Sequence, residues 1–308
     1  MGNYLGAIKN WIDLQHKADQ AIFAVVDYHG ITTPHNPETY QQQIMDVILD
    51  YLAAEIDPKK SLLIRQSKVP QHTELGWIFN TITPVSWVDR LPTYKEQLEK
   101  TGVNNMGLLD YPVLMAADIL IYKSNMVPVG EDQMPHIDLT NEIAKRFNSS
   151  YGETFEPVKV HLAEGARIMS LQDPKKKMSK TGDEGIVLSD DPDTIRSKIK
   201  KAVTDSGKEI YFDEDKKPAI SNLLTIFSLL SGKDVTDTEN EYKGKSYVDF
   251  KSDLAEMVIN FLKPFQEKRK EFENNPEKVK EILERSEEKA RQLTNITLRE
   301  VRQKMGLE

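Results

Sequence analysis

The stretches "AIFAVVD" at residues 21–27 and "SLLIRQ" at residues 61–66 decide the fold class. Each is a short apolar run of strand length that ends in a polar residue. Between them, Asn36 followed by Pro37 favours the start of a helix, and the apolar residues that follow keep helical spacing. A strand, a helix and a second strand in this order predict a parallel sheet covered by helices, and so an α/β fold.

A third short strand is expected at "MVPVG", residues 126–130, with helical segments around it. Ligands of parallel sheets bind beyond the carboxyl ends of the strands. Asp27, His29 and Gly130 all follow such ends. The sequence therefore predicts a binding site in the segments that follow these strands.

From residue 191 the chain becomes richer in charge, and "DPDTIRSKIKKAV" opens a helical region. Two apolar stripes at helical spacing follow. The first consists of Leu254, Met257, Val258, Phe261, Leu262 and Phe265. The second consists of Val279, Ile282, Leu283, Ala290, Leu293, Val301 and Met305. We expect an α/β domain over residues 1–190 and a helical bundle over residues 191–308.

The composition excludes several classes of chemistry. The 308 residues include no cysteine, which rules out disulfides, Fe–S clusters and thiol catalysis and fits a reducing cytoplasm. The formal charge of −8 argues against broad nonspecific binding of nucleic acid but allows a local basic groove. The apolar runs are too short to span a bilayer.

The segment "PKKKMSKTGDEG", residues 174–185, gathers four lysines in this acidic chain. Lysines supply point charge for a phosphate group, and the hydroxyls of Ser179 and Thr181 supply hydrogen-bond donors. Lysine runs are also common in solvated surface loops. From charge alone, both a phosphate clamp and a plain surface loop stay open.

The segment "LLDYPVLMAADILIY", residues 108–122, is expected to be a helix that places Tyr111, Met115 and Asp118 within one narrow arc. Asp118 has apolar neighbours, and a buried carboxylate must be paired or hydrogen-bonded. It is either a structural aspartate bonded to backbone amides or part of a pocket wall that accepts one N–H from a ligand.

The stretch "VPVGEDQ", residues 127–133, offers a glycine directly after a strand, where a ligand can approach the backbone closely. Glu131 and Asp132 are candidates to accept hydrogen bonds from ribose hydroxyls, and Gln133 is a candidate to orient an amine. Acidic turns after strands are common, so this stretch alone is weak evidence for a nucleotide site. The other acidic and histidine residues show no spacing typical of zinc ligands, and no protein-bound metal is expected.

Together these residues resemble a known family. Residues 177–181, Lys-Met-Ser-Lys-Thr, resemble the second signature of class I aminoacyl-tRNA synthetases, with Thr181 in place of the usual serine. Six stretches resemble tryptophanyl-tRNA synthetases of bacterial type, in order and at family spacing: "GNYLGAIKNWIDLQH", "YPVLMAADIL", "VPVGEDQ", "GARIMSLQDPKKKMSKT", "AVTDS" and "ISNLLTIFSLLSG". Tyrosyl enzymes share the fold and the loop, but their pocket helix resembles Tyr-x-x-x-Gln-x-x-Asp. Here Met115 takes the middle position, which suits an indole better than a phenol.

The resemblance implies a Rossmann-like catalytic domain, with helices on both faces of its sheet, that activates L-tryptophan with ATP and Mg²⁺ and transfers it to tRNA(Trp). It also implies a C-terminal helical domain that binds the anticodon, and a cytoplasmic homodimer. By family position the catalytic residues are Lys177, Lys180, Lys95 and Asn3. The implied ATP site comprises Gly2, Asn3, Gly130, Glu131, Asp132, Ile168, Lys177, Met178, Ser179, Lys180 and Thr181. The implied tryptophan site comprises Asp118, Tyr111, Met115, Gln133, His29, Val127 and Val129.

One departure concerns the start of the sequence. Met1-Gly2-Asn3 match only the last three positions of the first family signature, and the family's first strand and turn do not precede them in this sequence. We expect weak ATP binding and slow turnover from the chain as written. A catalytically impaired homologue that binds tryptophan, nucleotide or RNA is therefore the alternative function.

Overall fold

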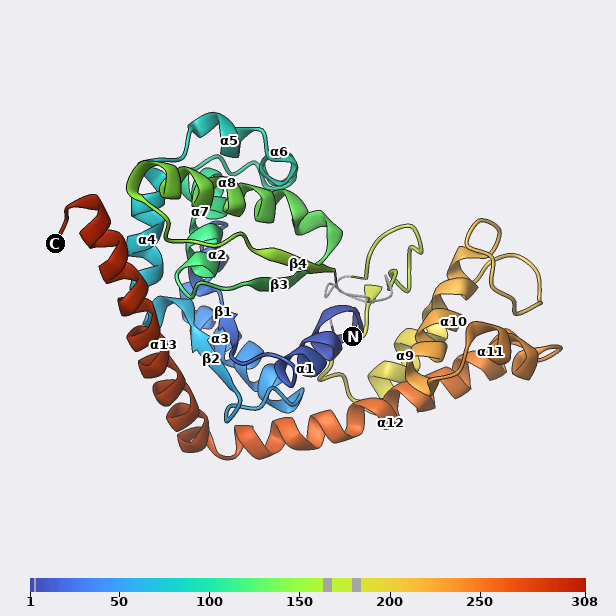
Figure 1. Cartoon of the computed structure of the whole chain (residues 1–308). Coiled ribbons are helices and arrows are strands. Elements are labelled where there is room, and N and C mark those ends of the chain that lie inside the picture. The colour runs from blue at the N-terminus through green and yellow to red at the C-terminus, as the bar shows by residue number, and fades with distance from the viewer. Residues whose placement is uncertain (3, 163–167, 179–183) are drawn as a thin grey trace. The chain divides into compact units, whose positions relative to one another are not determined.

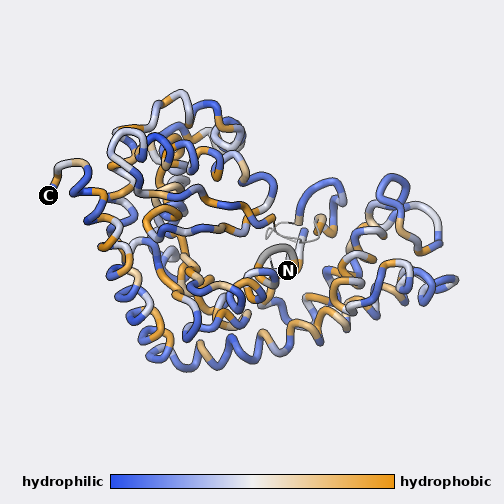
Figure 2. Tube along the Cα trace, in the orientation of Figure 1, coloured by the Kyte–Doolittle hydropathy of each residue, from blue (hydrophilic) through white to orange (hydrophobic). Residues whose placement is uncertain are grey.

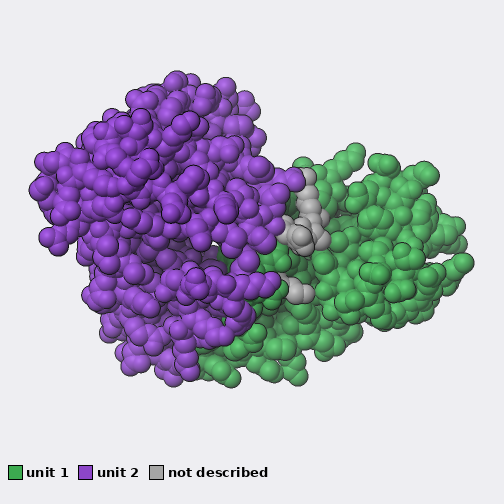
Figure 3. All heavy atoms as spheres, viewed as in Figure 1, with its two compact units in different colours: residues 1–13, 53–55, 164–274 green, residues 14–52, 56–163, 275–308 purple. Residues whose placement is uncertain are grey.

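The computed structural model describes residues 1–2, 4–162, 168–178 and 184–308 (Figure 1). Asn3 and the segments 163–167 and 179–183 are not among them. The chain forms two compact units (Figure 3). Unit 1 consists of Met1–Asp13, Ala53–Glu55 and Glu164–Asn274, and unit 2 consists of Leu14–Leu52, Ile56–Ala163 and Asn275–Glu308.

Unit 2 contains the four strands of the described residues, in two parallel pairs. Strand β1 (Ala21–Val25) pairs with β2 (Ser61–Arg65), and β3 (Met126–Val129) pairs with β4 (Lys159–Leu162). Helix α3 (Pro37–Ala53) connects β1 to β2, and the Asn36 side chain accepts the backbone N–H of Glu38 at 3.0 Å. The predicted strand–helix–strand unit with parallel pairing is confirmed.

The remaining helices of residues 27–151 surround these strands. They are α2 (Asp27–Gly30), η2 (Gln66–Lys68), α4 (Gln71–Asn80), α5 (Val85–Asp89), α6 (Pro92–Thr101), α7 (Met106–Leu120), η3 (Glu131–Gln133) and α8 (Met134–Tyr151). Helix α7 packs against both α4 and α8. Its apolar residues share a core with those of α4 and α8, which includes Phe79, Ala116, Ala117 and Phe147. This packing holds α7 firmly and so determines where Asp118 lies.

The last helix, α13 (Pro276–Met305), also belongs to unit 2 and runs along β2 and α4 (Figure 1). Ala290 packs with Leu62, Ile64 and Val69. Glu287 accepts two hydrogen bonds from the guanidinium of Arg65, at 2.7 and 3.0 Å. The expectation of a single helical bundle after residue 191 therefore fails for α13, because its apolar stripe covers the sheet instead.

Unit 1 is helical. Its elements include η1 (Tyr4–Ile8), the first part of α1 (Lys9–Gln15), α9 (Pro192–Lys201), α10 (Pro218–Ser231), α11 (Val235–Tyr242) and α12 (Tyr247–Glu273). Polar and apolar residues alternate along α12 (Figure 2), and the predicted stripe contributes Leu254, Val258, Leu262 and Phe265 to the buried side. A functional boundary at residue 190 stays a prediction. No helix in the described ranges is both long and apolar enough to cross a membrane.

Candidate functional site

Asp118, on α7, accepts hydrogen bonds from three side chains of unit 2. Its Oδ1 accepts the Nδ1–H of His72 at 2.6 Å and the amide of Gln66 at 2.8 Å. Its Oδ2 lies 2.8 Å from Nε2 of His29 and 2.9 Å from the same Gln66 amide. The Asp118 side chain is 13% exposed. The carboxylate is thus partly buried and hydrogen-bonded, and these donors are side chains rather than backbone amides.

The parallel pairing of β1 and β2 explains how these donors meet. Helix α2, with His29, follows β1, and Gln66 follows β2, so both lie at the same edge of the sheet. Two further hydrogen bonds join these strand ends. The Tyr28 N–H donates to Gln66 Oε1 at 3.1 Å, and the Ser67 N–H donates to the Asp27 carboxylate at 2.8 Å. Gln66 is fully buried, so its amide is held in one orientation.

The charge at Asp118 follows from two opposing effects. Burial raises the pKa of its carboxyl group, but the hydrogen bonds with His29 and His72 lower it more. The net pKa lies below the ordinary aspartate value, so Asp118 is a carboxylate at neutral pH. Burial and the nearby Asp118 charge raise the pKa of Tyr122, which keeps its phenol protonated.

Tyr111 lies on the same helix and belongs to a second cluster. Its hydroxyl lies 3.0 Å from Thr93 Oγ1 and 2.9 Å from Nε2 of His136, and the His136 ring lies tilted beside the phenol. Burial raises the pKa of Tyr111 and lowers that of His136, so both groups favour their neutral forms. His29 packs edge-on against Tyr111, with ring centroids 6.0 Å apart. The edge-on rings connect the two clusters.

The other predicted pocket residues lie on neighbouring elements. Met115, Val127 and Val129 are partly buried against the core shared by α4, α7 and α8. The Gln133 amide donates to the Asp132 carboxylate at 2.8 Å. A Cβ atom at Gly130 would lie 2.8 Å from Oδ1 of Asp132, an exposed side chain that can move aside. Glu131 and Asp132 are both exposed.

The described part of the lysine-rich segment belongs to unit 1. Lys177 pairs with Met169 in an antiparallel bridge, and the Met178 N–H donates to the Ile168 carbonyl at 3.0 Å. A Cβ atom at Gly2 would lie 3.3 Å from Cβ of Met178, which places the N-terminal residues against this bridge. Asn3, Ser179, Lys180 and Thr181 lie outside the described residues. Lys95, on α6, is exposed.

Sequence reasoning missed Gln66, His72, Tyr122 and His136 as members of these clusters. Only Gln66 could have been predicted from the sequence as a site residue, because it directly follows a buried strand, as Asp27 does. His72 and Tyr122 lie on α4 and just past α7 and meet only through helix packing.

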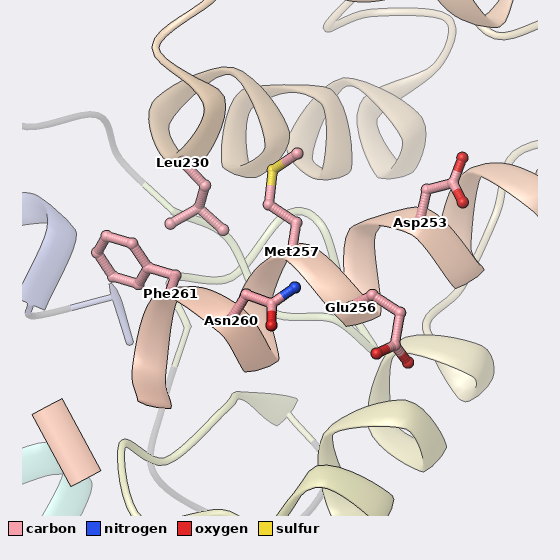
Figure 4. Close-up of a pocket in the computed structure, with 6 residues that line it drawn as sticks. All are labelled: Leu230, Asp253, Glu256, Met257, Asn260 and Phe261. Atoms are coloured by element: carbon pink, nitrogen blue, oxygen red, sulfur yellow. The ribbon is translucent and has the colours of Figure 1, made fainter. Parts of the chain in front are cut away.

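The described residues contain no group of three or more acidic or histidine side chains arranged to hold a metal ion. A pocket of about 470 Å³ opens elsewhere, in unit 1 (Figure 4). Leu230 of α10 lies there beside Met257 and Phe261 of α12. None of the residues predicted to bind substrate lines this pocket, so the candidate site stays with the Asp118 cluster.

Comparisons with known proteins identify the family of this chain. The family model for class I tRNA synthetases of tryptophan and tyrosine matches residues 1–263. The tryptophan–tRNA ligase of Bacillus anthracis is 44% identical over 100% of this chain and 94% of its own length. That of Caldanaerobacter subterraneus is 45% identical with the same coverage.

A solved structure agrees as well. The crystal structure of the Campylobacter jejuni tryptophanyl-tRNA synthetase, complexed with ADP and tryptophan, superposes with a TM-score of 0.87 at 33% identity. The match covers 99% of this chain and 95% of that one. The resemblance drawn from the sequence is confirmed, and the chain belongs to the class I tRNA synthetases of the tryptophan and tyrosine family, in its bacterial tryptophanyl branch.

Proposed function

We propose that the chain is a tryptophan–tRNA ligase. It activates L-tryptophan with ATP, releases pyrophosphate, and transfers the tryptophanyl group to the terminal ribose of tRNA(Trp). Family membership over the whole chain supports this activity, as does the relative from Campylobacter jejuni that holds ADP and tryptophan.

The charged carboxylate of Asp118 carries the choice of tryptophan over phenylalanine, and Met115, where the tyrosyl pattern has glutamine, carries the choice over tyrosine. Asp118 lies on the same helix as Met115, whose thioether suits a flat apolar ring. A carboxylate in such a place accepts the N–H of an indole, and phenylalanine has no ring donor to offer. A site that hydrogen-bonds its substrate discriminates strongly against an analogue lacking the group. His29 is the most exposed donor on Asp118, and the substrate N–H would approach on its side.

The chemistry requires no covalent enzyme intermediate. A tryptophan carboxylate oxygen attacks the α-phosphorus of ATP, and the bond from that phosphorus to the oxygen bridging to the β-phosphate breaks. A ribose hydroxyl of the tRNA then attacks the carbonyl carbon, and AMP leaves. The protein contributes positioning and charge stabilisation.

The nucleotide residues stay as the sequence predicts them. Lys177, Lys180 and Lys95 would stabilise the departing pyrophosphate, and Gly130, Glu131, Asp132 and Ile168 would surround adenosine. Gly2, Asn3, Met178, Ser179 and Thr181 complete the proposed ATP site. Mg²⁺ would arrive with ATP as part of the substrate.

The first proposed partner is tRNA(Trp), whose anticodon would bind the helical part of residues 191–308. The second is another copy of the chain. Both would be met in the cytoplasm, where translation consumes charged tRNA. Exposed apolar side chains support the homodimer. Trp77, Val85 and Met106 are 71%, 68% and 72% exposed, on the packed elements α4, α5 and α7. Large exposed apolar groups mark interaction surfaces. Trp77→Lys is expected to shift the sedimenting species from dimer to monomer.

The test of the amino-acid assignment is Asp118→Ala, with equilibrium binding of tryptophan and of ATP measured separately. Removing a charged acceptor from a buried donor costs about 1.5–3 kcal/mol, so tryptophan affinity should fall by roughly tenfold to a hundredfold while ATP affinity changes little. Asp110→Ala is the matched control, since Asp110 lies on the same helix and accepts a hydrogen bond from Asn80. Equal losses for both ligands would contradict the assignment. An absence of tryptophan-dependent pyrophosphate exchange in the wild-type chain would favour the impaired homologue.

A further inference from the structure

Behind Asp118 lie the buried His72 and the partly buried Tyr122, for which the proposed chemistry has no use. His72 is 1% exposed, its Nδ1 lies 2.6 Å from Asp118 Oδ1, and its Nε2 lies 2.8 Å from the Tyr122 hydroxyl. The two rings meet edge to face with centroids 5.3 Å apart. Neither side chain faces the more open side of Asp118, where His29 lies.

The proton positions in this pair follow from chemistry. The Asp118 carboxylate can only accept, so Nδ1 of His72 must carry a hydrogen. The Tyr122 phenol keeps its proton because burial and the Asp118 charge raise its pKa. It can therefore donate to Nε2 of a neutral His72 ring, which fixes the Nδ1–H tautomer. The chain Tyr122, His72, Asp118 is thus ordered from the phenol to the carboxylate.

Gln66 completes the support on the same side. Its amide bonds both oxygens of Asp118, and its own carbonyl accepts the Tyr28 N–H. A carboxylate has about four acceptor directions, and buried groups take those on Oδ1. Gln66 and the partly exposed His29 take the two directions on Oδ2, so a ligand N–H reaches that oxygen by taking the place of His29.

We propose that His72 and Tyr122 are positioning residues that, together with Gln66, hold the Asp118 carboxylate in one orientation and so set the preference for a substrate ring that carries an N–H. This proposal rests on the proposed function. Without the Tyr122 hydroxyl, His72 can turn or change tautomer, and Asp118 loses its fixed donor. Recognition of the substrate N–H should weaken, whereas apolar contacts with the ring should persist.

Tyr122→Phe tests the proposal with two ligands, tryptophan and its analogue with sulfur in place of the ring N–H, 3-benzothienylalanine. We expect the variant to bind tryptophan about tenfold more weakly, the equivalent of one hydrogen bond, and to bind the sulfur analogue as the wild type does. Tyr151→Phe is the matched control, because Tyr151 is a partly buried tyrosine of unit 2 that packs on Phe147. Equal weakening for both ligands, or none, would overturn the positioning role.

Two His72 variants distinguish the effect of the N–H donor to Asp118 from the effect of the imidazole ring. His72→Asn keeps an N–H near the place of Nδ1 and should retain most of the preference for tryptophan over the sulfur analogue. His72→Leu removes the donor and should lose that preference by about tenfold. If the two variants lose the preference equally, the donor to Asp118 is not what matters and the proposal fails. Tyr122→Phe decides the question should His72→Leu fail to fold. If the wild type itself binds both ligands equally, the proposed function fails instead.

Discussion

Around Asp118 in unit 2, His72 and Gln66 are buried and hydrogen-bonded, whereas Lys175 and Lys177 in unit 1 are exposed. Both regions carry residues predicted to bind substrate. The difference matches the ligands. A flat ring with one N–H needs an acceptor held in a fixed place, while a phosphate chain needs positive charge that can approach it. The position of the Asp118 carboxylate depends on side-chain packing. The position of the lysine-rich segment depends on how its backbone is anchored.

The anchors of the lysine-rich segment are buried, whereas its described lysines, Lys175, Lys176 and Lys177, are exposed. The Asn222 side chain bonds both the N–H and the carbonyl of Met169, each at 2.9 Å, and Met169 pairs with Lys177. Lys198, also buried, donates to the Gly185 carbonyl at 3.1 Å and to Asp190 at 2.8 Å. The backbone on either side of residues 179–183 is thus fixed in unit 1.

The largest expected effect comes from removing charge in the exposed region. Lys177→Ala should slow tryptophan-dependent pyrophosphate exchange by about a hundredfold to a thousandfold, as for loss of one preorganised donor, with tryptophan affinity nearly unchanged. Lys180→Ala is expected to behave alike. Lys175→Ala is the control, from the same run and equally exposed. Equal slowing by Lys175→Ala would show that the lysines act only through their total charge. The contrast between a fixed acceptor at Asp118 and specific cations in the lysine-rich segment would then be wrong.

A smaller effect on pyrophosphate exchange is expected from Asn222, which anchors the lysine-rich segment through Met169. Asn222→Ala should slow exchange by about tenfold, because two hydrogen bonds of about 1 kcal/mol each hold Met169, the bridge partner of Lys177. Asn141 is a matched control in unit 2, since its side chain bonds the N–H and the carbonyl of Val158 in the same way, at 2.8 and 3.1 Å. Both variants should lose similar thermal stability. Only Asn222→Ala should slow exchange, and parallel slowing by Asn141→Ala would reduce the effect to general destabilisation.

The smallest effect on binding is expected for Glu287→Gln. Weakening its paired hydrogen bonds with Arg65 should lower the free energy of unfolding by about 1–3 kcal/mol, measured by urea denaturation. Tryptophan affinity should change by less than about threefold, since the strand pairing and the Asp27–Ser67 bond still hold Gln66. Glu288→Gln, at the exposed neighbouring position, should leave both quantities unchanged. A large loss of tryptophan binding in Glu287→Gln would show that α13 takes part in the site.

Local pattern was enough to predict β1, β2, β3 and helix α3, because each depends on residues close in sequence, but β4 was not predicted. The family was likewise recognisable from short motifs. The partners of Asp118 were not, because His29, Gln66 and His72 lie 89, 52 and 46 residues before it in the chain. Periodicity identifies which side of a helix is buried but not what covers it. For the same reason α13 was grouped with the wrong helices.

Helix α13 belongs to unit 2 although unit 1 separates it from the rest of that unit in the sequence, and this order affects folding during synthesis on the ribosome. Unit 1 emerges largely between the second and third segments of unit 2, and residues 275–308 are translated last. Until they emerge, Leu62, Ile64 and Val69 lack the cover of Ala290, and Arg65 lacks Glu287. A nascent chain stalled at residue 274 therefore exposes an apolar sheet face, a natural target for chaperones and proteases. Unit 2, which holds the Asp118 cluster, reaches its protected form only after residues 275–308 have left the ribosome.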